Sequence, residues 1–199
     1  MRPCATGWIA PPVRSPVADL LADLARAFDA RGIPWYLFGA QAAIVYGVAR
    51  LTADVDVTAH VPAGDVTWIE AIESHGFERR FRDARFALQS RVIPVVHRTS
   101  GLPVDIVLAG PGLEEQFLER AVTHSIDGVA VPVIDVSDLV VLKVLAGRPK
   151  DLDDLAALMR TNGARLDERR VRALLGDLEA ALGQSDLLRT FDAIRPRSQ

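Results

Sequence analysis

The sequence predicts an α/β (α+β) fold, in which a small mixed sheet flanked by helices is followed by a C-terminal helical bundle. Two observations lead to this prediction. Up to about residue 135, short β-forming runs alternate with helical segments and turn signals. From Ser137 onward the apolar periodicity is helical, with breaks at 147–149, 162–163 and 183 that separate three or four helices.

The individual elements follow from local signals. Ser15-Pro16 has the form of an N-cap followed by proline in the first turn, which predicts a helix to about Arg31. Asp127-Gly128 between two β-forming runs predicts a tight hairpin, and the turn 98–102 should join two more strands. The other expected elements are strands at 33–38, 54–59, 92–97, 104–108, 123–126 and 129–133, and helices at 41–48, 64–75, 112–121 and, less distinctly, 82–91.

Composition sets limits on the organisation and on the partners. Residues 1–14 should form a flexible tail, 15–135 the α/β catalytic domain, and 136–199 a helical region packed on it. No apolar run approaches the ~20 residues needed to span a bilayer, so we expect a cytoplasmic protein without membrane contact. Cys4 is the sole cysteine, which excludes an internal disulfide and a thiolate zinc site. The net charge of −3 argues against broad electrostatic capture of nucleic acid.

Two aspartates are the strongest chemical signal. Asp54 and Asp56 lie two residues apart in a β-forming run, so their side chains should point to the same face of a strand. Like charges placed side by side are unfavourable unless a cation lies between them. A turn stabilised by Asp side chains is the simpler alternative, but the alternating valines around the pair favour a strand. This spacing therefore predicts a metal site.

A third carboxylate fits the same interpretation. Asp105 is the only charged residue in the β-forming run 103–108. A single Asp in a strand is more often an edge residue. If this strand neighbours the first one, however, Asp54, Asp56 and Asp105 converge and could hold one or two Mg²⁺ (or Mn²⁺) ions for phosphoryl chemistry.

The chain contains only two lysines among its 23 basic residues, and both fall in one short segment. Lys143 is the only charged residue between Asp138 and Arg148 in an otherwise apolar helix, so it either extends from the helix edge or enters a site. A compact ammonium acts as a point charge on phosphate, which favours a functional role for Lys143 and Lys150.

These segments together resemble a known family. A glycine turn at Phe38-Gly39-Ala40, a short helix, the string from Arg50 to Val57 and the later single-Asp strand are similar to the nucleotidyltransferase fold of the polymerase-beta superfamily. The resemblance covers roughly residues 34 to 160. It is closest to the small bacterial branch that includes AbiEii-type toxin nucleotidyltransferases and aminoglycoside nucleotidyltransferases.

The resemblance implies a metal-dependent transfer of a nucleoside monophosphate from an NTP to a hydroxyl group. Asp54 and Asp56 would bind the metal, Asp105 would hold a second metal or act as the base, and Lys143 would contact the phosphates. The family commonly has Gly-Ser or Gly-Gly where this chain has Gly39-Ala40, so phosphate binding would depend on backbone N–H groups at the helix start. The other nucleotide-binding residues implied are Gly39, Ala40, Gln41, Arg50, Thr52, Lys150, Asp151 and Asp154.

The acceptor is the least defined part of the prediction. The resemblance favours RNA, such as a tRNA end, and a separate antitoxin partner. RNA would need local basic surface near the acidic residues, whereas a cationic small molecule such as an aminoglycoside would need an acidic wall. A non-catalytic nucleotide-binding module of the same fold is a further alternative. The basic candidates are Arg79, Arg80, Arg82, Arg85, Arg148 and Lys150, and the acidic ones are Asp151, Asp153 and Asp154.

Overall fold

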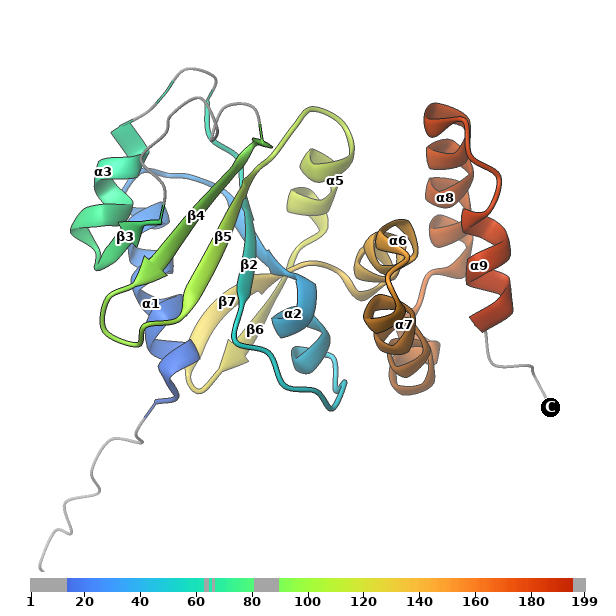
Figure 1. The fold of residues 1–199 in the computed structure, drawn as a ribbon, viewed down its shortest axis with the longest axis horizontal. Helices are drawn as coiled ribbons and strands as arrows, with labels where there is room; N and C mark the ends of the chain where they lie inside the picture. The colour runs from blue at the N-terminus through green and yellow to red at the C-terminus, as the bar shows by residue number, and fades with distance from the viewer. Residues whose placement is uncertain (1–13, 63–64, 66, 81–89, 195–199) are drawn as a thin grey trace, which may run out of the picture.

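A seven-stranded mixed sheet organises the first two thirds of the chain (Figure 1). The computed structural model describes residues 14–62, 65, 67–80 and 90–194. The strand order is β3-β4-β5-β2-β1-β7-β6, in which the β1–β7 and β2–β5 pairs are parallel and the others antiparallel. The strands are β1 (Trp35–Phe38), β2 (Val55–Ala59), β3 (Phe77–Arg79), β4 (Val92–His97), β5 (Pro103–Leu108), β6 (Val122–Ile126) and β7 (Val129–Val133).

Helices cover this sheet unequally. Helices α1 (Pro16–Asp29) and α3 (Thr67–Ser74) lie together on one face, while no labelled helix lies in front of β4 and β5 in the view of Figure 1. Helix α2 (Gly39–Val45) connects β1 to β2 and packs on both, and α5 (Leu113–Arg120) precedes the β6–β7 hairpin. The buried core is formed by apolar side chains of the strands and of α1, and it continues through the other α-helices into the C-terminal part.

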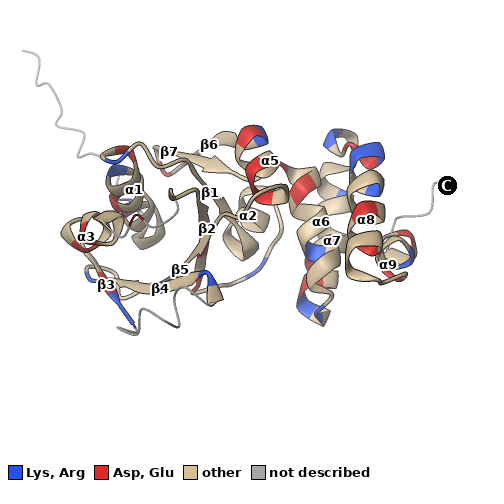
Figure 2. Cartoon of the chain, turned by 90° about the horizontal axis from the view of Figure 1, so that it is seen from above, with Lys and Arg blue, Asp and Glu red and all other residues tan. Residues whose placement is uncertain are grey.

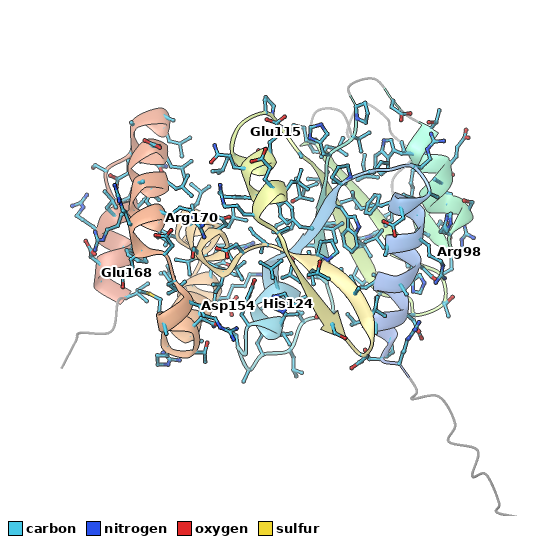
Figure 3. All side chains as sticks on the ribbon, turned by 180° about the vertical axis from the view of Figure 1, so that it is seen from behind. Arg98, Glu115, His124, Asp154, Glu168 and Arg170 are labelled. Atoms are coloured by element: carbon cyan, nitrogen blue, oxygen red, sulfur yellow. The ribbon has the colours of Figure 1, made fainter. Side chains whose placement is uncertain are left out.

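The last third of the described chain is helical. It contains α6 (Val136–Ala146), α7 (Pro149–Asn162), a short 3₁₀ turn (Gly163–Arg165), α8 (Glu168–Leu182) and α9 (Leu187–Ile194). Asp138 of α6 is fully buried and accepts hydrogen bonds from Arg120 of α5, at 2.8 and 3.1 Å, and Arg170 of α8 lies 3.7 Å from it. Figure 3 shows Arg170 reaching from α8 toward α6. This ion-pair network ties the helical part to the sheet part.

Most of the predicted elements are present. The mixed sheet with flanking helices is confirmed, as are the pairing of β4 with β5 and the tight β6–β7 hairpin. Asp127 and Gly128 both have positive φ, as that hairpin turn requires. The C-terminal breaks also match, because Gly147 and Gly183 end α6 and α8 in the left-handed conformation.

Other expectations need correction. The helix predicted at 41–48 begins at Gly39 and ends at Val45, and the short strand β3 was not predicted. Helix α6 begins one residue before Ser137, and its N-cap is Asp135, whose carboxylate accepts from the Ser137 N–H. The Ser137 hydroxyl accepts from the Asp167 N–H at the start of α8. The tail at 1–13 and most of the helix expected at 82–91 fall outside the described residues.

One buried histidine connects two parts of the sheet domain. His97 is fully buried at the end of β4, where Nε2 lies 2.9 Å from Asp23 of α1 and Nδ1 lies 2.8 Å from the Ser100 hydroxyl. It links α1 to the β4–β5 turn, which is a structural role. None of the helices in the described ranges is long and apolar enough to cross a membrane.

Candidate functional site

The sheet register places two of the predicted carboxylates side by side. In the parallel β2–β5 pair Asp56 lies directly opposite Asp105, and across the β1–β2 pair Asp56 lies opposite Phe38. Asp54 lies one residue before β2 and is exposed, whereas Asp56 and Asp105 are half-buried. The Asp105 strand therefore neighbours the Asp56 strand, which is the condition set from the sequence, whereas Asp54, predicted to lie within that strand, precedes it.

A cavity of about 230 Å³, here called the charged cavity, opens at this point between the sheet edge and helices α6 and α7. Four carboxylates and four cations line it, so its formal charges balance; Asp151 is paired directly with Lys143 and Arg148, whereas Asp56 and Asp105 lie on the strands. Figure 2 shows basic and acidic residues together at one end of the α6–α7 pair. The acidic lining is Asp54, Asp56, Asp105 and Asp151, the basic lining is Arg50, Lys143, Arg148 and Lys150, and the rest is Phe38, Gly39, Ala40 and Thr52.

The turn between β1 and α2 requires a glycine for a reason that the sequence did not reveal. Gly39 has φ +67°, and a Cβ atom at this position would overlap the Asp56 carboxylate. That carboxylate also accepts a hydrogen bond from the Ala40 N–H. Asp56 thus occupies the space over Gly39 at the start of α2.

The electrostatics of Asp56 are unfavourable to its charged form. Burial raises its pKa, and the negative charges of Asp105 and Asp54 raise it further; Lys143 and the Ala40 N–H oppose this only in part. A divalent cation would relieve this repulsion, and carboxylate oxygens are the donors that Mg²⁺ and Mn²⁺ prefer. The donor chemistry therefore fits such an ion.

The side-chain positions support the metal site less directly. Within the described ranges, no group of three or more His, Cys, Asp or Glu side chains stands close enough together to hold a metal ion. Asp54, Asp56 and Asp105 share one cavity wall, but their oxygens do not converge on a point as the side chains stand. Their role as metal ligands stays a prediction.

Lys143 enters the site and does not lie on the outer surface. Its side chain is 6% exposed, and Nζ lies 3.0 Å from Asp151 Oδ1 and 2.7 Å from Asp154 Oδ2. Arg148 binds the other oxygen of Asp151, with Nε at 2.5 Å. Burial alone would raise the pKa of Asp151, but Arg148 and Lys143 outweigh it and hold that pKa below its usual range. Two buried acids therefore fix the ammonium at the cavity wall.

Arg50 joins the same network from the other side of the site. Its Nη1 lies 2.5 Å from Asp154 Oδ2, the same oxygen that binds Lys143. Asp154, which belongs to α7, therefore links the loop before β2 to Lys143 of α6. Figure 3 shows Asp154 in the space between α7 and α2. Asp154 does not line the charged cavity; it holds two cations that do.

The remaining predicted residues fall in different places. Thr52 lines the charged cavity, and its hydroxyl accepts from the Asp54 N–H at 3.4 Å. Gln41 is buried in α2 and does not line the cavity. Lys150 is exposed at its rim. Phe38 and Arg148 also line the charged cavity, although they were not among the nucleotide-binding residues expected from the sequence. For Phe38, its position directly before Gly39 could have indicated that it lies at the site.

The four arginines at 79–85 that were proposed to hold RNA are not found at the charged cavity in the described part of the chain. Arg79 pairs with Glu73 at 2.7 Å, and neither Arg79 nor Arg80 lines the charged cavity. Arg82 and Arg85 lie outside the described residues. Of the basic residues proposed to hold RNA, Arg148 and Lys150 are the two at the site.

Two further spaces adjoin the charged cavity. The apolar pocket, about 260 Å³, is walled mainly by Phe38, Leu139, Leu142, Leu145 and Ala146. The second space, here called the groove, measures about 530 Å³ between the 47–51 loop and α7, and shares Arg50 and Lys150 with the charged cavity. Arg160 and Asp153 also line the groove, and Leu51 at its edge is 97% exposed.

Comparisons with known proteins agree with this geometry. The solution structure of the antibiotic-resistance factor ANT(2'')-Ia is similar to this chain at 16% identity with a TM-score of 0.57, covering 84% of this chain and 95% of that one. An antigenic nucleotidyltransferase-like protein from Paracoccidioides brasiliensis is similar at 18% identity and TM-score 0.54, covering 92% and 95%. The lincosamide antibiotic adenylyltransferase LnuA is similar at 15% identity and TM-score 0.50, covering 73% and 96%.

At these identities the structural likeness shows the fold, which is the nucleotidyltransferase fold, and not the substrate. No curated protein sequence matches the chain. These findings support the superfamily resemblance but not the narrower AbiEii branch. A family model described as nucleotidyl transferase of unknown function (DUF2204) matches residues 18–180, most of the chain, and the protein therefore belongs to that family.

Proposed function

We propose that this protein is a divalent-metal-dependent nucleotidyltransferase that transfers a nucleoside monophosphate from an NTP to a hydroxyl acceptor. The observation that carries the proposal is that one cavity brings carboxylates of the β2 and β5 segments together with basic side chains. Asp56 and Asp105 lie opposite each other on neighbouring strands with Asp54 beside them, and Arg50 and Lys143 line the same cavity. A triphosphate with bound cations needs carboxylates for the metal and basic groups for the phosphates.

Asp54, Asp56 and Asp105 would hold Mg²⁺ or Mn²⁺. When bound, such an ion neutralises charge on the triphosphate and orients it. Carboxylate oxygens are the donors that a hard cation prefers, and the raised pKa of Asp56 marks the repulsion that the ion would remove.

Phosphate binding would depend mainly on side chains. Gly39, Ala40 and Gln41 provide backbone N–H groups at the start of α2, but the Ala40 N–H is already donated to Asp56. Arg50 and Lys143 are held at the cavity by Asp154, and Arg148 and Lys150 lie at its edge. Lys143 would stabilise the negative charge that develops on the leaving pyrophosphate.

The chemical step is an in-line displacement. The acceptor oxygen forms a bond to the α-phosphorus, the bond from that phosphorus to the bridging oxygen of the pyrophosphate breaks, and pyrophosphate leaves. The proton of the acceptor hydroxyl passes to Asp105, which lies opposite Asp56 on the neighbouring strand and acts here as the base in place of binding a second metal.

An RNA acceptor, such as a tRNA end, is favoured by the charges around the site. The acidic wall that a cationic small molecule would need is largely neutralised, because Asp151 binds Lys143 and Arg148, and Asp154 binds Lys143 and Arg50. The groove beside the cavity adds Arg160 to Arg50 and Lys150, which suits a phosphate backbone.

The test is transfer of label from each of four α-³²P-labelled NTPs, with Mg²⁺, to total RNA and to a small-molecule panel. Tobramycin and lincomycin belong in the panel because ANT(2'')-Ia and LnuA of the same fold are described with them. Labelled RNA that disappears with EDTA and in Asp56→Asn supports the proposal. Label on a panel compound alone would identify the small-molecule alternative, and NTP binding without transfer to anything would identify a non-catalytic module.

A toxin role neutralised by an antitoxin is the most specific part of the proposal, and it depends on the motif resemblance. Expression of the chain alone should arrest growth of a bacterial host, whereas Asp56→Asn should not. Co-expression of the neighbouring reading frame should restore growth and yield a complex on purification. Normal growth on expression of active enzyme would remove the toxin assignment while leaving the transferase proposal intact.

A further inference from the structure

The apolar pocket lies directly beside the charged cavity, and the two share five residues. Phe38, Gly39, Lys143, Arg148 and Asp151 contribute to both, so one ligand can extend from one space into the other. Such a ligand must carry a highly charged part and an apolar part. An NTP has both, in its triphosphate and in its nucleobase.

The walls of the apolar pocket come mostly from one face of α6. Leu139 is fully buried at its base, Leu142 and Leu145 are half-buried, and Ala146 is exposed at its mouth. Phe38 lies across from them at the end of β1, so aromatic and aliphatic groups dominate the surface. This surface favours the face of a flat, weakly polar group.

The size of the pocket and its planar lining groups also favour a flat ligand of the size of a nucleobase. About 260 Å³ is somewhat below the ~300–1,000 Å³ typical of sites for drug-sized ligands, which suits a fragment such as a base. Phe38 and the Arg148 guanidinium are the two planar groups in the lining, and bases stack on both kinds of group.

The polar groups of the pocket are already committed to one another. Lys143 binds Asp151 at 3.0 Å, and Arg148 binds the other oxygen of Asp151. Both oxygens of Asp151 are therefore taken, and a base edge could donate to this carboxylate only by displacing one of the two cations, which is costly. The pocket can therefore recognise the shape of a base, but it has little means to identify which base is present.

We infer that the apolar pocket is the nucleobase subsite of this enzyme, and that it accepts all four common bases with little discrimination. The inference rests on the proposed function, since it places the base of the NTP whose triphosphate lies in the charged cavity. A pocket walled mainly by apolar side chains distinguishes bases only weakly, because every base has a similar stacking face.

The test measures binding and not turnover. Calorimetric titration in Mg²⁺ would use the α,β-methylene analogues of ATP, GTP, CTP and UTP, whose α–β bridge cannot release pyrophosphate, and inorganic tripolyphosphate, which has no base. The four analogues should bind within about tenfold of one another. Tripolyphosphate should bind at least about tenfold more weakly than they do, because stacking of the base is lost.

Two variants fill the pocket without touching the charged residues. Leu142→Trp enlarges a half-buried side chain of the wall, and Ala146→Phe adds a ring at the exposed mouth, where folding is not at risk. Each should weaken the four analogues about tenfold, to the affinity of tripolyphosphate, and leave tripolyphosphate itself unchanged. Leu178→Trp makes the same exchange at a half-buried leucine of α8 that lines neither space, and should change nothing.

The possible results separate the two proposals. If both filled variants bind the analogues as the wild type does, the base lies elsewhere and the inference is wrong, although the proposed function stands. If they bind the analogues normally but lose transfer, the pocket belongs to the acceptor, which also overturns the inference. Strong preference for one base would contradict recognition by shape. If neither analogues nor tripolyphosphate bind the wild type, the proposed function itself fails.

Discussion

Gly39 and Asp56 fit together so closely that the carboxylate of Asp56 occupies the position where a Cβ atom of residue 39 would lie. Gly39 ends the turn from β1 into α2, and Asp56 lies on the neighbouring strand β2. The absence of a side chain at residue 39 is what lets Asp56 reach the Ala40 N–H at the start of α2. The glycine is thus required by the position of an acidic residue as well as by the backbone turn.

Gly39→Ala should abolish nucleotide transfer by displacing Asp56. The variant also introduces a methyl group at φ +67°, which costs about 1–2 kcal/mol of stability by itself. Gly32→Ala is the matched control, because Gly32 has φ +60° and nothing within 4 Å of its added Cβ. Chemical unfolding should show a similar backbone cost in both variants, while only Gly39→Ala loses transfer. Equal activity of the two variants would contradict the close fit.

Asp56→Asn should remove activity and stabilise the fold at neutral pH. The folded-state pKa of Asp56 is raised, chiefly by burial and then by Asp105 and Asp54, so the unfolded chain loses this proton first as pH increases. Stability therefore falls as pH rises from about 4, the ordinary pKa of Asp, through the raised folded value. Urea unfolding should show the variant equal to the wild type below about pH 4 and more stable at pH 7.

The exposed Asp54 is the control for that experiment. Asp54→Asn should also impair transfer, since Asp54 lines the same cavity, but its effect on stability should stay within about 0.5 kcal/mol. If Asp56→Asn is not more stable than the wild type at pH 7, the repulsion between Asp56 and its neighbours Asp105 and Asp54 is already relieved in the wild-type protein.

Lys143→Arg should lower the rate of transfer by about tenfold, which corresponds to ~1.4 kcal/mol in the barrier. The ammonium is enclosed between Asp151 and Asp154, and a planar guanidinium is too wide to take that position without moving both acids. Lys150→Arg is the same exchange at an exposed position of this cavity, where a guanidinium has room, and it should lower the rate less than Lys143→Arg does. Full activity of Lys143→Arg would return this lysine to a purely structural role.

Asp154→Asn should destabilise the protein by about 2–3 kcal/mol. The buried carboxylate binds both Lys143 and Arg50, and its loss leaves two cations partly unpaired in a poorly hydrated place. Asp153→Asn, at the adjacent exposed position of α7, should change the free energy of unfolding by no more than about 0.5 kcal/mol. A double-mutant cycle with Arg50→Met measures the coupling directly, and a coupling near zero would show that the loop is held in some other way.

The acidic side of the site could be predicted from local patterns. Strand periodicity identified β2 and β5 with Asp56 and Asp105 in them, because alternating side chains of a half-buried strand leave a period of two in the sequence. The two lysines stood out because arginine supplies nearly all other positive charge. Glycines 147 and 183 marked helix ends because a left-handed terminal residue favours glycine.

The basic side of the site was decided only by the tertiary structure. Arg50 and Asp154 are 104 residues apart, and they meet because α6 packs on α2 and α7 packs on α6. The sequence grouped Asp151 and Asp154 with the cleft but could not distinguish an acidic wall from two acids neutralised by Lys143, Arg148 and Arg50. The reason is physical: a local period reports which face of an element is buried, whereas the partner of a buried charge depends on how separate elements pack.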